Sequence, residues 1–196
     1  MSDWRTKLVD YVTGECQPVD KLSHMPRLVV FTQRVGQNLS FDEDVVFAAV
    51  WLHDLGVFHG HRPDDPITLA SWDHTAYAIG RSPDILNQVG FPSEKIPAVI
   101  EAIRTHKPND DPTTIEGTIL RDADILEQLG AVTVLRTASK VGRDTRFFTL
   151  DDVVKSLRKQ LDVLPTKLHL ESSKTLAILR IEALRQFLEA WKNESN

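Results

Sequence analysis

The stretch that decides the fold is Val45-Val46-Phe47-Ala48-Ala49-Val50-Trp51-Leu52-His53-Asp54, an apolar run that ends in an imidazole and a carboxylate. Asp42, just before the run, is a residue typical of a helix start, and Gly56, just after it, is typical of a helix end. The pattern therefore predicts a buried helix that delivers His53 and Asp54 at its carboxyl end.

Apolar residues elsewhere in the chain also recur at helical rather than alternating spacing. Ser93 is expected to begin a helix that ends near His106, and Thr149 with Asp152 three residues later is expected to begin another. The last third of the chain predicts two amphipathic packing helices over about residues 150–192. Strands are hard to find, and the fold class is therefore predicted to be all-α.

Length, charge and cysteine content limit the classes of protein to consider. A chain of 196 residues can bury one sizeable core, and we expect a single domain over residues 1–196. The net charge of −5 argues against a nucleic-acid polymer as partner.

The longest apolar stretch is too short to cross a membrane, and no signal peptide is visible, so a cytoplasmic location is expected. Cys16 is the only cysteine, which excludes an internal disulfide and a thiolate zinc framework.

Further side chains of metal-ligand type accompany His53 and Asp54 along the helical pattern. His24 precedes them, and His74, His106 and Asp124 follow. Imidazole and carboxylate ligands without cysteine suit a divalent transition metal such as Mn, Fe, Co, Ni or Zn. Asp124 lies within an apolar helical pattern, where a buried carboxylate needs a compensating partner such as a cation.

The ordered set His24, His53, Asp54 and Asp124 resembles the ligand set of the HD-domain superfamily of metal-dependent phosphohydrolases. The last residue lies inside the segment 121–131, in an Ala-Asp-x-Leu-like context. The resemblance covers about residues 22–141 and is closest to the small stand-alone bacterial members. It implies a single-domain helical bundle of the HD-domain type, with its metal-site core in that range and these four residues as metal ligands.

The resemblance also implies roles for His74 and His106. His74 and His106 match positions that bind a second metal in dinuclear relatives, whereas in mononuclear relatives equivalent histidines contact substrate phosphate. The site is therefore expected to hold one ion or two. His53 and Asp54 are the catalytic candidates together with Lys107, the nearest cation in sequence for the charge on a transferred phosphoryl group.

The expected enzyme is a phosphohydrolase that releases phosphate or pyrophosphate from a small phosphate ester or nucleotide by metal-activated water. Two alternatives stay open: an HD-fold di-iron oxygenase that cleaves a C–C or C–P bond, and a non-catalytic metal-binding module. The chain is expected to be a monomer or homodimer. The polar loop 57–66 is either a lid or a solvated connector, and Asp122 is either a surface acid or a residue that orients a ligating histidine.

Overall fold

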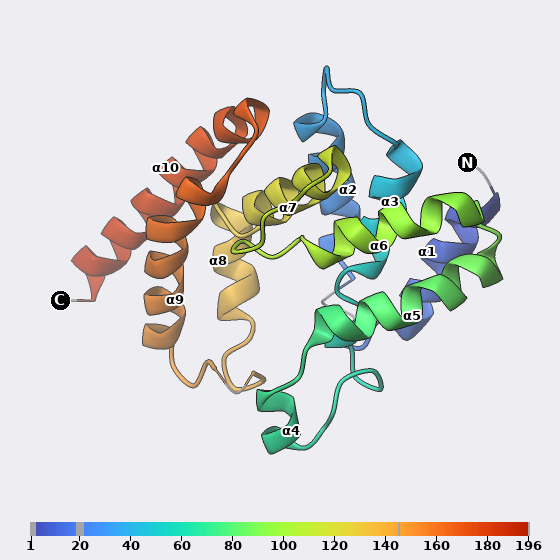
Figure 1. Cartoon of the computed structure of the whole chain (residues 1–196). Helices are drawn as coiled ribbons and strands as arrows, with labels where there is room; N and C mark the ends of the chain where they lie inside the picture. The colour runs from blue at the N-terminus through green and yellow to red at the C-terminus, as the bar shows by residue number, and fades with distance from the viewer. Residues whose placement is uncertain (1–2, 19–21, 145, 196) are drawn as a thin grey trace. The chain divides into compact units, whose positions relative to one another are not determined.

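The computed structural model describes residues 3–18, 22–144 and 146–195. Within these ranges the chain is helical, with two isolated β-bridges and no strand, which confirms the predicted all-α class. The helices, in chain order, are α1 (Asp3–Glu15), α2 (His24–Val35), α3 (Glu43–Leu52), η2 (Leu55–Val57), α4 (Pro66–Ala70), α5 (His74–Val89), η3 (Ser93–Lys95), α6 (Ile96–Arg104), α7 (Ile115–Glu127), α8 (Ala131–Ala138), α9 (Leu150–Val163), η4 (Leu164–Lys167) and α10 (Glu171–Glu194) (Figure 1).

The chain divides into two compact units, Met1–Arg121 and Asp122–Asn196, and the division falls inside α7. The sequence analysis placed the end of the metal-site core later, at about residue 141. The expected organisation as one domain over residues 1–196 stays a prediction.

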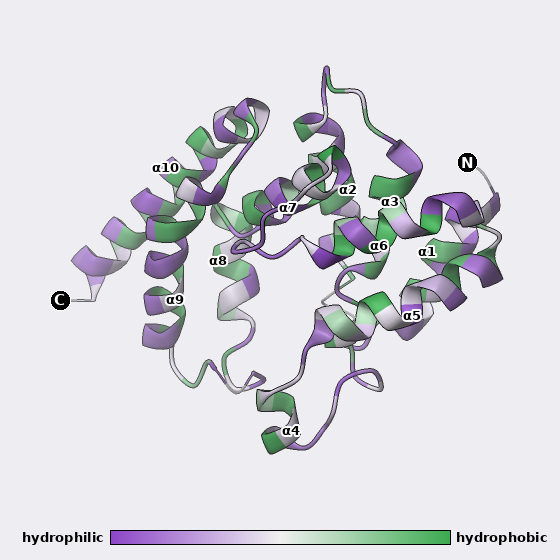
Figure 2. Ribbon diagram, viewed as in Figure 1, coloured by the Kyte–Doolittle hydropathy of each residue, from purple (hydrophilic) through white to green (hydrophobic). Residues whose placement is uncertain are grey.

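In the first unit, α3 is the central helix. It packs against α1, α2 and α6, and nearly all of its residues after the first turn are buried. Figure 2 shows that the start of α3 is hydrophilic and that the following part is hydrophobic. Asp42 begins the helix as predicted, because its carboxylate accepts hydrogen bonds from the backbone N–H groups of Asp44 and Val45. The apolar run thus fixes the place at which His53 leaves the helix.

The remaining helices of the first unit complete the surroundings of α3. α5 packs against α1, α6 and η2. It ends at Gly90, which has the left-handed conformation that glycine favours (φ 82°). The helix predicted to start at Ser93 begins there only as the short η3. The α-helix proper starts at Ile96, because Pro97 in its first turn needs no intrahelical partner.

In the second unit, α8, α9 and α10 pack against one another. Both predicted C-terminal helices are present, and Figure 2 shows hydrophilic and hydrophobic residues mixed along each of them. Thr149 and Asp152 form the predicted capping box at the start of α9. None of the helices among the described residues combines the length and the apolar character needed to cross a membrane.

Leu28 and Val30 of α2 offer a matched test of the first core. Leu28 is fully buried one turn after His24, whereas Val30 is 52% exposed. Leu28→Ala should lower the free energy of unfolding by about 2–5 kcal/mol because it removes buried methyl groups and leaves a cavity. Urea unfolding followed by far-UV circular dichroism measures this loss. Val30→Ala should change the midpoint little, and equal losses for the two variants would contradict this account of the core.

Candidate metal centre

Four imidazoles and one carboxylate of the first unit form a continuous cluster. The ring centroids of His24 and His53 lie 5.6 Å apart, those of His53 and His106 lie 5.0 Å apart, and those of His106 and His74 lie 6.0 Å apart. Asp54 adds its carboxylate to the cluster. The fold thus brings together five of the sequence-predicted site residues, which come from positions far apart in the chain.

Each of these side chains lies at or near a helix end. His24 is the first residue of α2 and His74 the first residue of α5. His53 directly follows α3, and His106 lies two residues beyond the end of α6. The start of α5 is fixed by Asp73, whose carboxylate accepts hydrogen bonds from the backbone N–H groups of the second and third helical residues. Helix ends therefore set the positions of all four rings.

Hydrogen bonds to backbone carbonyls orient two of the rings. His53 Nδ1 lies 2.8 Å from the carbonyl oxygen of Val50, and His106 Nδ1 lies 2.7 Å from that of Ile103. A carbonyl oxygen can only accept, so each Nδ1 carries a proton, and in the neutral ring the lone pair is on Nε2. This is the tautomer of a histidine that binds a metal through Nε2.

The Nε2 atom of His53 is the clearest sign that the cluster suits a cation. The side chain is fully buried, and Nε2 has no hydrogen-bond partner. A buried acceptor without a partner costs free energy that a bound ion would offset. One ligand atom from each of His53, Asp54 and His106 can be chosen so that all three lie within 4.8 Å of one another. These residues therefore fit a divalent metal ion.

The two oxygens of Asp54 face different imidazoles. Oδ2 lies 3.6 Å from His53 Nε2, and Oδ1 lies 3.7 Å from His74 Nε2. Burial raises the pKa of Asp54, but the surrounding imidazoles, led by His53, outweigh this effect and hold the pKa well below its usual range. The carboxylate is therefore ionised at neutral pH and can serve as an anionic ligand on both sides.

Burial has the opposite consequence for His74, whose side chain is 30% exposed. Removal from water lowers the pKa of His74 below the ordinary value of 6.5, and the charges of His106 and Lys107 lower it further, while Asp54 raises it. The net shift is downward. The neutral imidazole, the form that binds metals, therefore persists to lower pH than in an exposed histidine.

Lys107, which the sequence predicts as a phosphate-binding cation, lies beside the cluster. It follows His106 directly, and its Nζ lies 3.2 Å from Asp73 Oδ1, one residue before His74. Its side chain is 38% exposed, so the ammonium group remains accessible to a ligand. The loop after it is held by Arg121, which donates hydrogen bonds to the carbonyls of Lys107 and Pro108.

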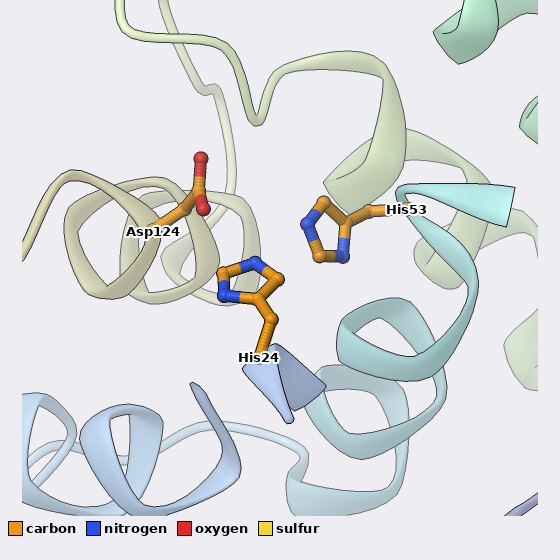
Figure 3. A group of neighbouring side chains, drawn as sticks. All are labelled: His24, His53 and Asp124. Atoms are coloured by element: carbon orange, nitrogen blue, oxygen red, sulfur yellow. The ribbon is translucent and has the colours of Figure 1, made fainter. Parts of the chain in front are cut away.

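Asp124 lies in the part of α7 that belongs to the second unit. Figure 3 draws it with His24 and His53 of the first unit. Its Oδ2 accepts a hydrogen bond from Gln128 Nε2 at 3.1 Å, one turn further along the chain.

Asp122 is not the surface acid considered in the sequence analysis. It is fully buried, and its carboxylate accepts hydrogen bonds from the backbone N–H groups of His169 and Leu170 at the start of α10. The partners lie 47 and 48 residues away and could not be read from the sequence.

The loop after Asp54 is tied to neighbouring helices. His61 Nδ1 lies 2.9 Å from the Tyr77 hydroxyl of α5, and His61 Nε2 lies 2.8 Å from Glu15 Oε2 of α1. His59 Nε2 accepts a hydrogen bond from Arg62 within the loop itself. These contacts favour the interpretation of loop 57–66 as an anchored connector.

The chain is therefore an all-α protein with a cluster of imidazole and carboxylate side chains at its helix ends. The chain belongs to the HD domain family, whose model matches residues 22–129. No curated protein matches the chain.

Several solved structures have the same fold. A protein from Lactobacillus plantarum is 17% identical, with a TM-score of 0.73 over 99% of this chain and 97% of its own. A Bacillus thuringiensis protein described as an HD-superfamily hydrolase is 18% identical, with a TM-score of 0.70 over 98% and 96%. Bacillus subtilis YpgQ, in complex with ADP, is 20% identical, with a TM-score of 0.70 over 97% of each chain. At these identities the likeness concerns the fold alone.

The pKa of His74 provides a test of the cluster in the metal-free protein. NMR titration of its imidazole should give a midpoint below 6.5, because burial disfavours the charged ring. Asp54→Asn should move the midpoint lower still, because it removes the carboxylate that stabilises the imidazolium.

The same shift has a consequence for stability. The unfolded chain binds a proton at His74 more readily than the folded chain, so the free energy of unfolding should fall as the pH is lowered from about 6.5. His74→Asn should reduce that fall. A His74 titration midpoint that is higher in Asp54→Asn than in the wild type would contradict the placement of Asp54 beside His74.

Proposed function

We propose that this chain is a metal-dependent phosphohydrolase that releases phosphate or pyrophosphate from a small phosphate ester or nucleotide. The observation that carries the proposal is the cluster of four imidazoles around one ionised carboxylate, with His53 Nε2 buried and lacking a hydrogen-bond partner. We assign His24, His53, Asp54 and Asp124 as metal ligands. We assign His74 and His106 to a second ion or to the phosphate that the first ion binds.

The ligand set supports a hard or borderline divalent ion. Nitrogen and oxygen donors suit Mn, Fe, Co, Ni or Zn, whereas the one cysteine, Cys16, is buried with its Sγ near the carbonyl of Pro18. A divalent ion bound here would polarise a phosphate oxygen and lower the pKa of a bound water.

The protein side chains supply orientation and charge. The carbonyls of Val50 and Ile103 orient two imidazoles with Nδ1 as the hydrogen-bond donor, so that Nε2 is the nitrogen available to an ion. Asp54 stays ionised at neutral pH and offers one oxygen to each side of the cluster. Lys107 offers a positive charge beside His106 for the oxygens of the transferred phosphoryl group.

A small nucleotide or phosphate ester fits the charge of the chain better than a nucleic-acid polymer does. The net charge is −5, which opposes binding along a polyanionic backbone. YpgQ of Bacillus subtilis, whose fold is similar, is described in complex with ADP, and this supports a nucleotide as the substrate class. We propose a monomer or homodimer as the active form.

Activity should depend on both the added metal and Asp54. Incubation of the protein with Mn²⁺, Co²⁺, Ni²⁺ or Fe²⁺ and a panel of nucleotides and sugar phosphates should release phosphate or pyrophosphate, and a chelator should abolish release. Asp54→Asn should lower kcat by roughly 100-fold or more because an anionic ligand is lost. The exposed Asp84→Asn is the matched control and should retain activity. Dioxygen consumption without phosphate release would replace this proposal with the oxygenase alternative.

Lys107→Ala should weaken phosphate recognition without removing the metal ligands. We expect kcat/KM to fall by about 10-fold or more, mainly through a higher KM, because a positive charge beside the phosphoryl group is lost. The KM of the wild type should also rise with salt more steeply than that of the variant. Steady-state kinetics at two ionic strengths measures both effects. Lys159→Ala, an exposed lysine of α9, is the control, and an unchanged KM in Lys107→Ala would remove this residue from the site.

A further inference from the structure

Trp72 joins the two segments that carry Asp54 and His74. It lies between α4 and α5, two residues before His74, and is partly buried. Its indole Nε1 donates a hydrogen bond of 2.8 Å to the carbonyl oxygen of Gly56, two residues after Asp54. A single side chain therefore bridges the η2 segment and the start of α5.

Gly56 also lies directly against the backbone of His74. It is buried, and a Cβ atom at this position would come within 2.6 Å of the carbonyl oxygen of His74 and within 2.8 Å of its Cα. Both are backbone atoms, which cannot rotate away as a flexible side chain could. The absence of a side chain at position 56 thus permits the close approach that brings His74 Nε2 to 3.7 Å from Asp54 Oδ1.

The indole of Trp72 is itself held in place on the α5 side. Its ring packs against Tyr77 one turn into the helix, with centroids 5.4 Å apart and planes inclined by 47°. The Tyr77 hydroxyl is in turn bonded to His61. Asp73, between Trp72 and His74, fixes the first turn of α5 through its bonds to Thr75 and Ala76. The N–H of the indole is therefore directed at Gly56 by the packing of the ring against Tyr77 of α5.

We propose that Trp72 is a positioning residue that acts through the Gly56 carbonyl to hold His74 at the distance from Asp54 at which both side chains bind the same divalent ion. This inference rests on the proposed metal site and on the first of the two roles proposed for His74, that of a ligand to a metal ion. Residues that orient metal ligands commonly change metal affinity about 10- to 100-fold when altered. We assign the effect of Trp72 to His74, because the Gly56 that it binds lies directly against the His74 backbone.

A double-mutant cycle on Co²⁺ binding tests this route. Trp72→Phe keeps a ring against Tyr77 but removes the N–H donor. It should raise the Kd for Co²⁺ by about 10-fold. His74→Ala should weaken the same Co²⁺-binding step. In the His74→Ala background, Trp72→Phe should cause no further loss, because the residue through which it acts is gone. Isothermal titration calorimetry and Co²⁺ absorption spectra measure the binding without any substrate.

Trp191→Phe in α10 is the matched control and should leave Co²⁺ binding unchanged. Gly56→Ala is a second variant and should weaken the same step, because the added methyl group displaces the His74 backbone. Far-UV circular dichroism and unfolding midpoints show whether each variant remains folded. The positioning role would be overturned if Trp72→Phe lowered the Co²⁺ affinity equally in the wild-type and His74→Ala backgrounds. It would also be overturned if Trp72→Phe left the affinity of the otherwise wild-type protein unchanged.

The two proposals fail in different ways. If the wild type releases phosphate in the presence of metal but Trp72→Phe binds Co²⁺ as tightly as the wild type, only the role of Trp72 is lost. If no phosphorylated compound is hydrolysed but the cycle shows coupling through His74, the positioning role stands and the hydrolase proposal is lost.

Discussion

The site depends on the hydrogen bonds that hold His53 and His106 to the carbonyls of Val50 and Ile103. The last carbonyls of an α-helix have no intrahelical partner, and a helix that stops at Leu52 or Arg104 leaves such acceptors near its end. The imidazole that follows each helix uses one of them. The fold therefore fixes the tautomer of both rings with the backbone alone.

This arrangement links metal affinity to the folding of the chain. With Nδ1 committed to a carbonyl, the buried Nε2 of His53 can be satisfied only by a donor or a cation that enters the cluster. An ion that binds the folded chain and not the unfolded chain adds to the free energy of unfolding in proportion to its affinity and concentration. The metal-free protein thus has a buried polar atom whose cost the apolar packing of α3 must offset.

Local signals in the sequence were sufficient for several helix ends, whereas the side chains proposed as ligands there were predicted from the resemblance to a family. Asp42 and Thr149 act through neighbours within three residues, which is why their roles could be predicted. The contact between Gly56 and the His74 backbone could not be predicted in this way. It depends on how η2 lies against α5, and glycine after a helix has an ordinary explanation as a helix stop. The role of Trp72 could not be predicted either, because its hydrogen bond to the Gly56 carbonyl also depends on how η2 lies against α5.

Asp122 and Asp124 show how one helix can serve two purposes. Residues two apart on an α-helix point in directions that differ by roughly 200°, so the two carboxylates lie on opposite faces of α7. Asp122 binds the backbone N–H groups at the start of α10, where the helix dipole favours a negative charge. Asp124 is held instead by Gln128. Removal of the Asp122 carboxylate therefore acts on the packing of the second unit, whereas removal of the Asp124 carboxylate leaves that packing contact in place.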